Sequence, residues 1–365
     1  NKVTLSSAML PANYDLLMIG GAGGFGKSTD DGVSWQQISG IAAGLTAIKY
    51  NPVYENFILA VGFNFYDVIS YDGGINWIER RFAVSGLDIY DVIFSPDGNY
   101  ALKCGGSGRI YKTTDLANSW VRVNNTSGAF RGFVYSNQLK WIICVGGSGS
   151  IRRSENDGDN WVDSKVNVDT NIDLRAVTSN PINGTLLTVG DSATAYTSTN
   201  DGLHWKEYAI GGAETFRAVA YSPDGSCVIA VGNNGNIYKS TDDGQTWSVS
   251  NSIEGGGSVT GVLDSIQFSP DGRYVIVTNG SQYIYKSTNN GATWVQVDTG
   301  IAKDFNSVEF RPRGNYMSPI PAGQTYNQAV SNSIVFSDLQ NGTDPDAEIF
   351  ILSGSELDLD GKMYL

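Results

Sequence analysis

The chain has 365 residues, of which 41% are hydrophobic and 17% charged, so it has enough apolar content for a substantial core. Its net charge of −13 argues against nucleic acid as a partner, because phosphate binding requires clustered lysines and arginines. No apolar run approaches the roughly 18–20 residues that a helix needs to cross a bilayer, so we expect no membrane insertion.

After an apolar run at Asp15–Ile19, an eight-residue pattern begins that occurs seven times along the chain. The copies, which we call signature loops, occupy residues 28–35, 70–77, 113–120, 154–161, 198–205, 240–247 and 287–294. Each copy ends in a tryptophan, and consecutive tryptophans are 41 to 47 residues apart. This period indicates a ring or stack of one supersecondary unit, which is more typical of a scaffold than of a catalytic site.

The unit between residues 216 and 250 shows the pattern of each repeat. The sequence predicts a first strand at Phe216–Tyr221, a second at Cys227–Val231 and a third at Asn236–Ser240. The signature loop follows, and a fourth strand is predicted at Trp247–Ser250. Glycine- and proline-containing turns separate the strands, so each unit is predicted to form one four-stranded antiparallel blade.

The two ends of the repeat complete each other. First strands are predicted at 45–50, 89–94, 130–135, 174–179, 216–221, 263–268 and 305–310. The N-terminal unit has no first strand, because Asp15–Ile19 aligns with second strands, whereas Phe305–Phe310 is a first strand with no signature loop after it. Pairing these two segments would leave no open edge, so we predict an all-β, seven-bladed β-propeller over residues 1–314, closed by a C-terminal strand.

Beyond Gly314 the repeat is lost. Residues 315–365 contain two prolines and two short apolar runs, Ser333–Phe336 and Glu348–Leu352. We expect a C-terminal extension that either packs on the propeller or serves as a docking arm on a neighbouring protein.

The signature loop resembles the Asp-box, or bacterial neuraminidase (BNR) repeat, Ser-x-Asp-x-Gly-x-Thr-Trp. Residues 240–247 match it at every position. Elsewhere Asn156, Asn200 and Asn289 replace Asp, Ala117 replaces Gly and His204 replaces Thr. Proteins with this repeat include sialidases, xyloglucan-active hydrolases, sortilin-type receptors, photosystem II assembly factors and phage proteins. The even distribution of the repeat looks more like the assembly factors and phage propellers than sialidases, whose Arg-Ile-Pro motif is absent here.

We expect the signature loops to be structural. Asp and Asn side chains can accept hydrogen bonds from turn N–H groups, and exchange of Asp for Asn keeps the acceptor oxygen. Glycine permits a backbone angle that other residues disfavour, and tryptophan covers the apolar side of the hairpin. A metal site or an acid–base role would tolerate the Asp-to-Asn exchange poorly.

Other motifs carry no cofactor or metal prediction. Gly21–Ser28 matches the phosphate-binding P-loop, but its Lys-Ser pair recurs on third strands and no helix is predicted to follow. His204 is the only histidine, which leaves no partner for a hydrolase triad or zinc site. Cys104, Cys144 and Cys227 lie in apolar strands and are expected to be buried free thiols.

Three arginines form the candidate binding site. Alignment of the first strands places Thr46, Tyr90, Arg131, Arg175, Arg217, Asp264 and Asn306 at one equivalent position. Arg131, Arg175 and Arg217 would therefore lie at one height on three consecutive blades, where their planar forks suit carboxylate, sulfate or phosphate. The alternative is that they pair with acids and backbone between blades. The photosystem assembly factors, which this sequence resembles, use an arginine patch, and this draws attention to the three arginines.

We therefore expect a non-enzymatic interaction propeller that binds a protein assembly partner or a cell-surface glycan. Among the resembling families this fits a virion component, such as a phage tail or decoration protein, and hence a virion or extracellular location. One alternative is a glycan-active hydrolase, which would use a carboxylate pair drawn from acids outside turns: Asp91, Glu214, Asp264 and Glu309. A photosystem-assembly-factor-like protein is the other.

Overall fold

The computed structural model describes the chain from residue 14 to residue 312, with short gaps, and two pairs near the C-terminus. The gaps are residues 22–23, 43, 55, 83–85, 126–127, 138–139, 165–167, 170 and 213, and the pairs are 356–357 and 363–364. The chain divides into two compact units, Asn1–Pro319 and Ile320–Leu365. In the second unit, β29 (Glu356–Leu357) pairs antiparallel with β30 (Met363–Tyr364). The runs expected at 333–336 and 348–352 and the proposed docking arm otherwise lie outside the described residues.

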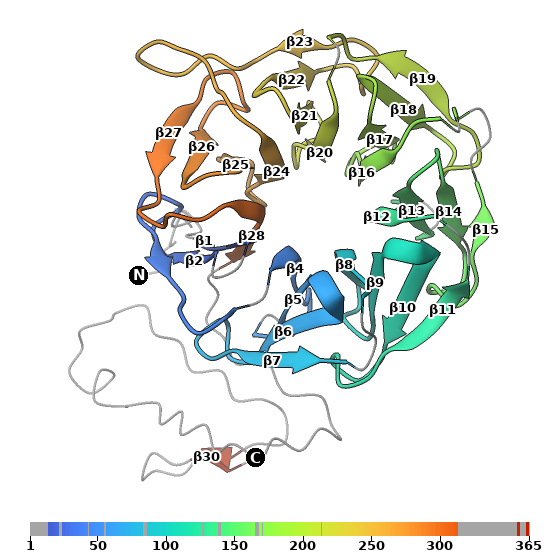
Figure 1. Cartoon of the computed structure of the whole chain (residues 1–365), viewed down its shortest axis with the longest axis vertical. Helices are drawn as coiled ribbons and strands as arrows, with labels where there is room; N and C mark the ends of the chain where they lie inside the picture. Colours follow the sequence, from blue (N-terminus) through green and yellow to red (C-terminus); the bar gives the residue numbers. More distant parts are fainter. Residues whose placement is uncertain are drawn as a thin grey trace, which may run out of the picture. The chain divides into compact units, whose positions relative to one another are not determined.

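Seven four-stranded antiparallel sheets form a ring, which confirms the predicted seven-bladed propeller (Figure 1). Blade 1 consists of β28 (Phe305–Pro312), β1 (Tyr14–Gly20), β2 (Phe25–Ser28) and β3 (Gln36–Gln37), and blade 2 of β4 (Leu45–Tyr50), β5 (Ile58–Gly62), β6 (Tyr66–Ser70) and β7 (Ile78–Arg81). Blade 3 consists of β8 (Ile89–Phe94), β9 (Ala101–Gly105), β10 (Arg109–Thr113) and β11 (Val121–Asn125), and blade 4 of β12 (Phe130–Tyr135), β13 (Ile142–Gly146), β14 (Ile151–Ser154) and β15 (Val162–Asp163). Blade 5 consists of β16 (Leu174–Ser179), β17 (Leu186–Gly190), β18 (Thr194–Ser198) and β19 (Lys206–Ala209). Blade 6 consists of β20 (Phe216–Tyr221), β21 (Val228–Gly232), β22 (Ile237–Ser240) and β23 (Ser248–Val249), and blade 7 of β24 (Leu263–Phe268), β25 (Val275–Asn279), β26 (Tyr283–Ser287) and β27 (Val295–Asp298). The first strands, which open each of these lists, are innermost.

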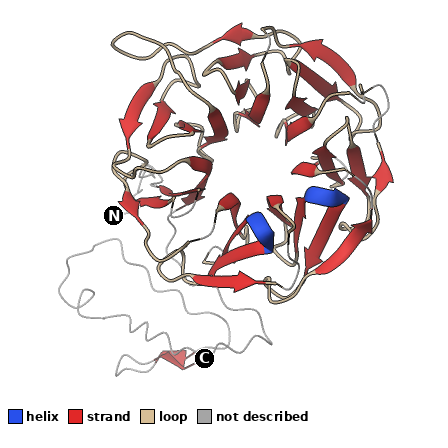
Figure 2. Ribbon diagram, in the orientation of Figure 1, coloured by secondary structure: helices blue, strands red, loops and turns tan. Residues whose placement is uncertain are grey.

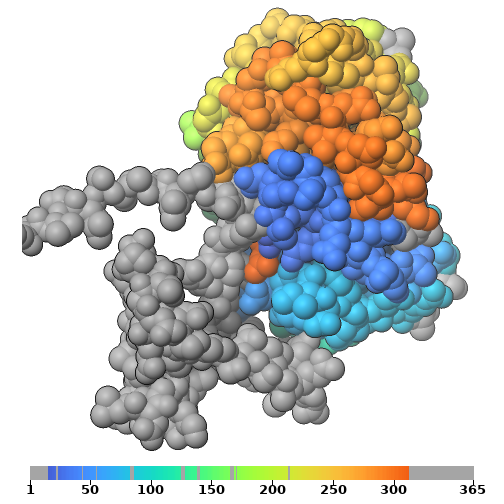
Figure 3. All heavy atoms as spheres, turned by 90° about the vertical axis from the view of Figure 1, so that its left-hand side faces the viewer, coloured from blue at the N-terminus to red at the C-terminus, as the bar shows by residue number. Residues whose placement is uncertain are grey.

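The ring closes through the predicted pairing of the two ends of the repeat. β28 pairs antiparallel with β1 along its length, for example Leu16 with Phe310 and Met18 with Val308. In Figure 3 the first described residues of the chain, in blue, lie directly against the orange residues of the last blade. Blade 1 therefore takes its innermost strand from the end of the repeat and the other three from its beginning.

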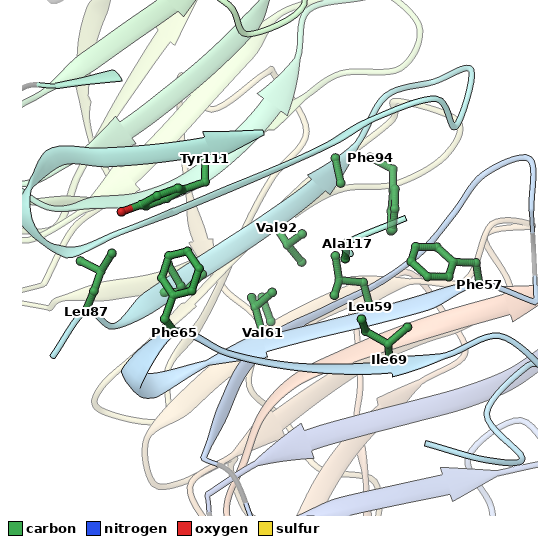
Figure 4. Close-up of a cluster of buried hydrophobic side chains, with 13 residues drawn as sticks. Phe57, Leu59, Val61, Phe65, Ile69, Leu87, Val92, Phe94, Tyr111 and Ala117 are labelled. Atoms are coloured by element: carbon green, nitrogen blue, oxygen red, sulfur yellow. The ribbon is translucent and has the colours of Figure 1, made fainter. Parts of the chain in front are cut away.

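The hydrophobic cores lie between adjacent blades. The cluster in Figure 4 joins Phe57, Val61 and Ile69 of blade 2 to Phe94 and Tyr111 of blade 3. Helical structure in the described residues is limited to two 3₁₀ turns, η1 (Phe63–Phe65) and η2 (Gly106–Gly108) (Figure 2). No helix in this part of the chain has the length and apolar character needed to cross a membrane.

Each signature loop is held by the hydrogen bonds expected of it. In residues 240–247, Asp242 Oδ1 accepts from Ser240 Oγ and from the N–H of Thr246, at 2.7 and 2.8 Å. The Ser240 hydroxyl in turn accepts from the N–H of Gly244 at 2.9 Å. Burial alone would raise the pKa of Asp242, but hydrogen bonds from Thr246 and Ser240 hold it below its ordinary value. The structural role predicted for the loop is confirmed.

The Asn-containing loops keep the same backbone bonds. Asn289 Oδ1 accepts from the N–H of Thr293 at 2.9 Å, while its amide nitrogen donates to the Thr293 hydroxyl at 2.8 Å. In residues 240–247 the direction is reversed, because the Thr246 hydroxyl donates to Asp242 at 2.6 Å. The hydroxyl can act either way, which explains why the exchange of Asp for Asn is tolerated.

Every blade also donates hydrogen bonds to the signature loop of the next blade. The donor–acceptor pairs, beginning at blade 1, are Arg311 to Gly73 O, Arg80 to Ala117 O, Lys112 to Asp159 Oδ1, Ser164 to Gly202 O, Asn180 to Asp243 Oδ1, Lys239 to Asn290 O and Lys286 to Asp31 O. The last pair joins blade 7 to blade 1, so these contacts run around the whole ring. The loops therefore connect blades as well as strands.

A buried ion pair reinforces the junction of blades 2 and 3. Lys103 Nζ lies 2.7 Å from Asp67 Oδ1, and both side chains are 0% exposed. The indole N–H of Trp120 donates to Asp67 Oδ2 at 2.8 Å, and the ammonium lies 3.8 Å from the centre of the Phe65 ring. Because neither charge reaches water, each depends on the other for its stabilisation.

We predict that Asp67→Ala lowers the free energy of unfolding by about 3–5 kcal/mol, because it leaves the Lys103 ammonium buried and unpaired. The double variant Asp67→Leu/Lys103→Met removes both charges and should lie much closer to the wild type. Chemical denaturation measures both. Equal losses in the two variants would contradict the role given to the pair.

Six of the seven blades have glycine where the second strand meets the start of the first. At Gly20, Gly62, Gly105, Gly146, Gly190 and Gly232, an added Cβ would overlap the carbonyl oxygen of the residue that precedes the first strand. The obstacle is backbone, which cannot move aside as a flexible side chain can. The absence of a side chain there lets the first strand approach closely.

We predict that Gly190→Ala destabilises the protein by about 1–3 kcal/mol through this overlap with the carbonyl of Asp173. The control is Gly21→Ala, where nothing lies within 4 Å of the added atom. Thermal unfolding of the two variants compares them, and indistinguishable melting temperatures would refute the close-approach argument.

Candidate functional site: the channel face of the first strands

One β-bulge interrupts the pairing of each first strand. The register shifts leave seven residues as the extra, unpaired positions: Thr46, Tyr90, Arg131, Arg175, Arg217, Asp264 and Asn306. These are the seven positions that the sequence alignment placed at one height in the ring. A bulge re-aims its side chain relative to a regular strand, so the same backbone feature presents each of the seven residues.

The three arginines line one cavity inside the ring. This cavity of about 490 Å³ follows the first strands and is lined by Arg131, Arg175 and Arg217 together with Tyr90 and Thr46. The arginines come from β12, β16 and β20, which are consecutive innermost strands in Figure 1. The structure thus brings the three predicted site residues to one surface.

Each of these arginines also meets an acid, as the alternative prediction expected. Arg175 Nε lies 2.7 Å from Asp191 Oδ1, and Arg217 Nη1 lies 2.8 Å from Asp264 Oδ1. Arg131 Nη2 is 3.6 Å from Asp173 Oδ2. The pairs of Arg131 and Arg217 reach to the following blade, so they connect blades in addition to orienting the guanidinium groups.

The pairs leave part of each guanidinium available. Among the described residues, Arg175 forms its hydrogen bond through Nε alone, so both terminal nitrogens are left to bind a ligand. Arg131 is 27% exposed and in that same part of the chain has only the long pair through Nη2, and its guanidinium lies 5.2 Å from the Tyr90 ring centre. The side chain of Arg217 is 41% exposed. Since a guanidinium has five N–H donors, an added carboxylate can bind without breaking the existing pairs.

The uncharged bulge residues of blades 1 and 2 are used differently. The Asn306 amide donates to Leu45 O at 2.8 Å, and the Thr46 hydroxyl donates to Ile89 O at 2.8 Å. Both bonds reach the next blade. These two positions therefore serve ring assembly, whereas the three arginines retain unused donors.

A second charged group consists of Lys49, Asp91 and Glu309, of which Lys49 and Asp91 line the same cavity as the arginines. The sequence singled out the two acids but did not predict that they meet Lys49. Lys49 Nζ lies 2.7 Å from Glu309 Oε2, which joins blades 2 and 1. Asp91 of blade 3 accepts from the N–H groups of Val92 and Phe133, each at 2.8 Å. The sequence held one signal from which this pair could have been predicted: Lys49 and Glu309 occupy the same inward position of their first strands.

Burial sets the ionisation of this group. Desolvation raises the pKa of Asp91 to about 6, against the opposing effects of Lys49 and of the two N–H donors. Burial alone would lower the pKa of Lys49, but Glu309 and Asp91 raise it above its ordinary value. The lysine therefore stays charged, while Asp91 titrates closer to neutrality than an ordinary carboxyl.

The acids considered for hydrolysis all have partners. Glu309 pairs with Lys49, Asp264 with Arg217, and Asp91 with two backbone N–H groups. Glu214 is 3% exposed and accepts from the N–H of Asn234 at 2.8 Å. These contacts give each of the four carboxylates a structural partner, and the hydrolase alternative stays a prediction.

The remaining sequence candidates occupy structural positions. His204 is exposed in its signature loop, and the three cysteines are buried and free, as expected. Phe25–Ser28 of the P-loop-like segment forms strand β2, and residues 22–23 lie outside the described part. No group of three or more potential ligands for a metal ion occurs among the described residues.

Comparisons with known proteins support the fold. No family model matches the sequence, and no curated protein matches it. The structure is similar to that of YCF48 bound to D1 peptide, with a TM-score of 0.58 and 18% identity, covering 81% of this chain and 88% of that one. It is also similar to YCF48 from Cyanidioschyzon merolae, with a TM-score of 0.56 and 19% identity, covering 72% and 87%. At this identity the likeness concerns the propeller fold.

We predict a pH dependence of stability from Asp91. Its pKa in the folded protein, about 6, lies above the ordinary value of 3.8, so the folded state binds the proton more tightly than the unfolded state. The contribution of this group to stability should therefore increase as the pH falls from about 7 to about 4. The measurement is the difference in unfolding free energy between wild type and Asp91→Asn as a function of pH. A difference that stays constant over this range would contradict the assignment.

Proposed function

We propose that the protein is a non-enzymatic interaction propeller that binds a carboxylate-bearing segment of a partner protein in its channel. The observation that carries the proposal is the arc of Arg131, Arg175 and Arg217 on three consecutive bulges of one cavity. Guanidinium forks bind carboxylates in a planar, two-point geometry, which gives such an arc directional preference.

The shape of the site supports a polypeptide ligand. The cavity follows several first strands, so an extended segment can contact more than one arginine at the same time. One of the fold relatives was solved with a peptide bound, which supports a peptide as the ligand class for this chain. The acids at Asp173, Asp191 and Asp264 disfavour a dense polyanion, because they neutralise much of the positive charge.

The test is a titration with labelled peptides, followed by fluorescence anisotropy. A glycine–serine peptide that carries a few widely spaced glutamates should bind the wild-type protein, and a glycine–serine peptide of equal length without them should not. The triple variant Arg131→Gln/Arg175→Gln/Arg217→Gln should weaken binding by at least about 100-fold, since each charge-assisted bond contributes about 1.5–3 kcal/mol.

The matched control is Arg273→Gln. Arg273 pairs with Asp271 in the turn between β24 and β25, so its loss removes one arginine without changing the arc. This variant should bind like wild type. Equal affinity of the triple variant and the control would overturn the proposed site, as would equal binding of the peptide without glutamates.

The finer assignments remain predictions of the sequence. A phage tail or decoration role, a virion or extracellular location, and a photosystem-assembly-factor-like function all require a known partner. Membership in the Asp-box family likewise remains a prediction, because it rests on the signature loops. The glycan-active hydrolase alternative would require sugar release from a polysaccharide that Asp264→Asn or Glu309→Gln abolishes.

A further inference from the structure

A groove lies between the outer strands of blades 5 and 6, on different strands from those that line the channel. It has a volume of about 630 Å³ and is formed by β18, β19 and the signature loops 198–205 and 240–247. This volume is in the usual range of about 300–1,000 Å³ for small-molecule sites. Its lining residues belong to the third and fourth strands of blade 5 and the loops beside them, except Thr185, which directly precedes the second strand, β17.

At this junction the chain lacks a lysine that several other blades have. In three other blades the residue before the signature loop is a lysine that reaches the next loop: Lys112, Lys239 and Lys286. In blade 5 this residue is Thr197, whose methyl group lies beside Gly244 of the next loop. Threonine lacks the four-carbon stem of lysine and cannot fill the same space.

The ring beneath that lysine is missing as well. Lys112 and Lys286 lie over the rings of Tyr100 and Tyr274, at 4.5 and 4.1 Å from their centres. The backbone carbonyl of each tyrosine accepts a hydrogen bond from the N–H of the residue five positions earlier. In blade 5 the carbonyl of Thr185 makes this same bond, so Thr185 is the counterpart of the two tyrosines. Two small hydroxyl residues thus replace the lysine–tyrosine pair.

These two threonines form a polar floor. Thr185 is 5% and Thr197 8% exposed, and both line the groove. Neither hydroxyl has a hydrogen-bond partner within the described residues. A nearly buried hydroxyl that opens only to a groove can bond to a ligand or water there.

The walls supply both donors and acceptors. Asn200 Oδ1 accepts from the N–H of His204, so the Asn200 amide nitrogen faces His204 Nδ1 at 3.1 Å and donates to it. The imidazole proton is then on Nε2, which makes that atom a donor. Gln245 lies on the opposite wall, where its Oε1 accepts from the Tyr208 hydroxyl at 3.5 Å and its Nε2 donates to Asp242 O at 3.1 Å. Each end of this amide keeps one further hydrogen-bonding position for a ligand.

The charges of the groove oppose each other. Lys206 lies on one wall, with its ammonium 4.6 Å from the Tyr208 ring centre, and Asp243 lies on the other. The Asp243 carboxylate already accepts from the amides of Asn180 and Asn183, each at 2.8 Å. A ligand with a full charge of either sign would therefore meet a like charge.

We propose that this groove binds a neutral saccharide. Each sugar hydroxyl both donates and accepts, which matches a lining of hydroxyl, amide and imidazole groups without excess charge. This site is separate from the arginine arc and goes beyond the peptide-binding function proposed above.

The test uses Thr197→Lys, which restores the side chain that three other blades carry. The introduced ammonium should take the place that Lys239 has at the next junction, so the variant should fold normally and lose the groove. Saturation-transfer NMR with neutral disaccharides of glucose, galactose, mannose and N-acetylglucosamine should detect binding to wild type. Thr197→Lys should weaken that binding by at least about tenfold, and Gln245→Ala should also weaken it.

The control variants separate this site from the channel and from folding. The triple arginine variant should bind the saccharide like wild type, and so should Lys239→Thr, which changes the corresponding lysine of blade 6. Melting temperatures confirm that each variant is folded. The proposal is overturned if none of the disaccharides binds, if Thr197→Lys binds equally well, or if only a lysine-rich peptide or an acidic sugar occupies the groove.

Discussion

The hydrogen bonds from each blade to the signature loop of the next are the interaction on which the rest of the structure depends. A single four-stranded blade has two apolar faces and cannot bury either alone. Here the cores lie between blades, so each blade is completed by its neighbours. The loop contacts hold those neighbours in register, and the pairing of β28 with β1 joins the last blade to the first.

This constraint also determines the site. Because all blades have the same register, the bulge of each first strand occurs at the same height, and a residue type repeated at that position becomes an arc. The second-strand glycines let the first strands approach closely at the bulges. A scaffold built for regularity can therefore create a binding surface by three substitutions at one position of the repeat.

The sequence predicted the parts of the structure that the repeat itself encodes. Six of the seven first strands have the predicted bounds, while β28 runs two residues further, and the bulge ring corresponds residue by residue to the aligned positions. The sequence did not predict the pairs Lys103–Asp67 and Lys49–Glu309, because their partners are 36 and 260 residues apart and meet only once the ring is formed. The alignment of first strands also missed the acids that pair with Arg131 and Arg175, because these acids lie outside the aligned strands.

The groove between blades 5 and 6 shows a different limit. Its signal in the sequence is the threonine at position 197, where an alignment of third strands has lysine in four blades. The missing lysine can be interpreted only once the structure shows that lysines at this position donate a hydrogen bond to the neighbouring signature loop. Departures from a repeat are informative once the contact made by the repeated residue is visible.

The most direct test of the account is native-state hydrogen exchange at the fifth residue of each signature loop. Its N–H donates to the Ser or Thr hydroxyl at the start of the same loop in all seven copies. If the blades depend on one another around the ring, all seven amides should exchange through one opening reaction, with the free energy of global unfolding. Exchange of one blade's amide at a much lower free energy, while the others stay protected, would show that blades open independently and would contradict the account.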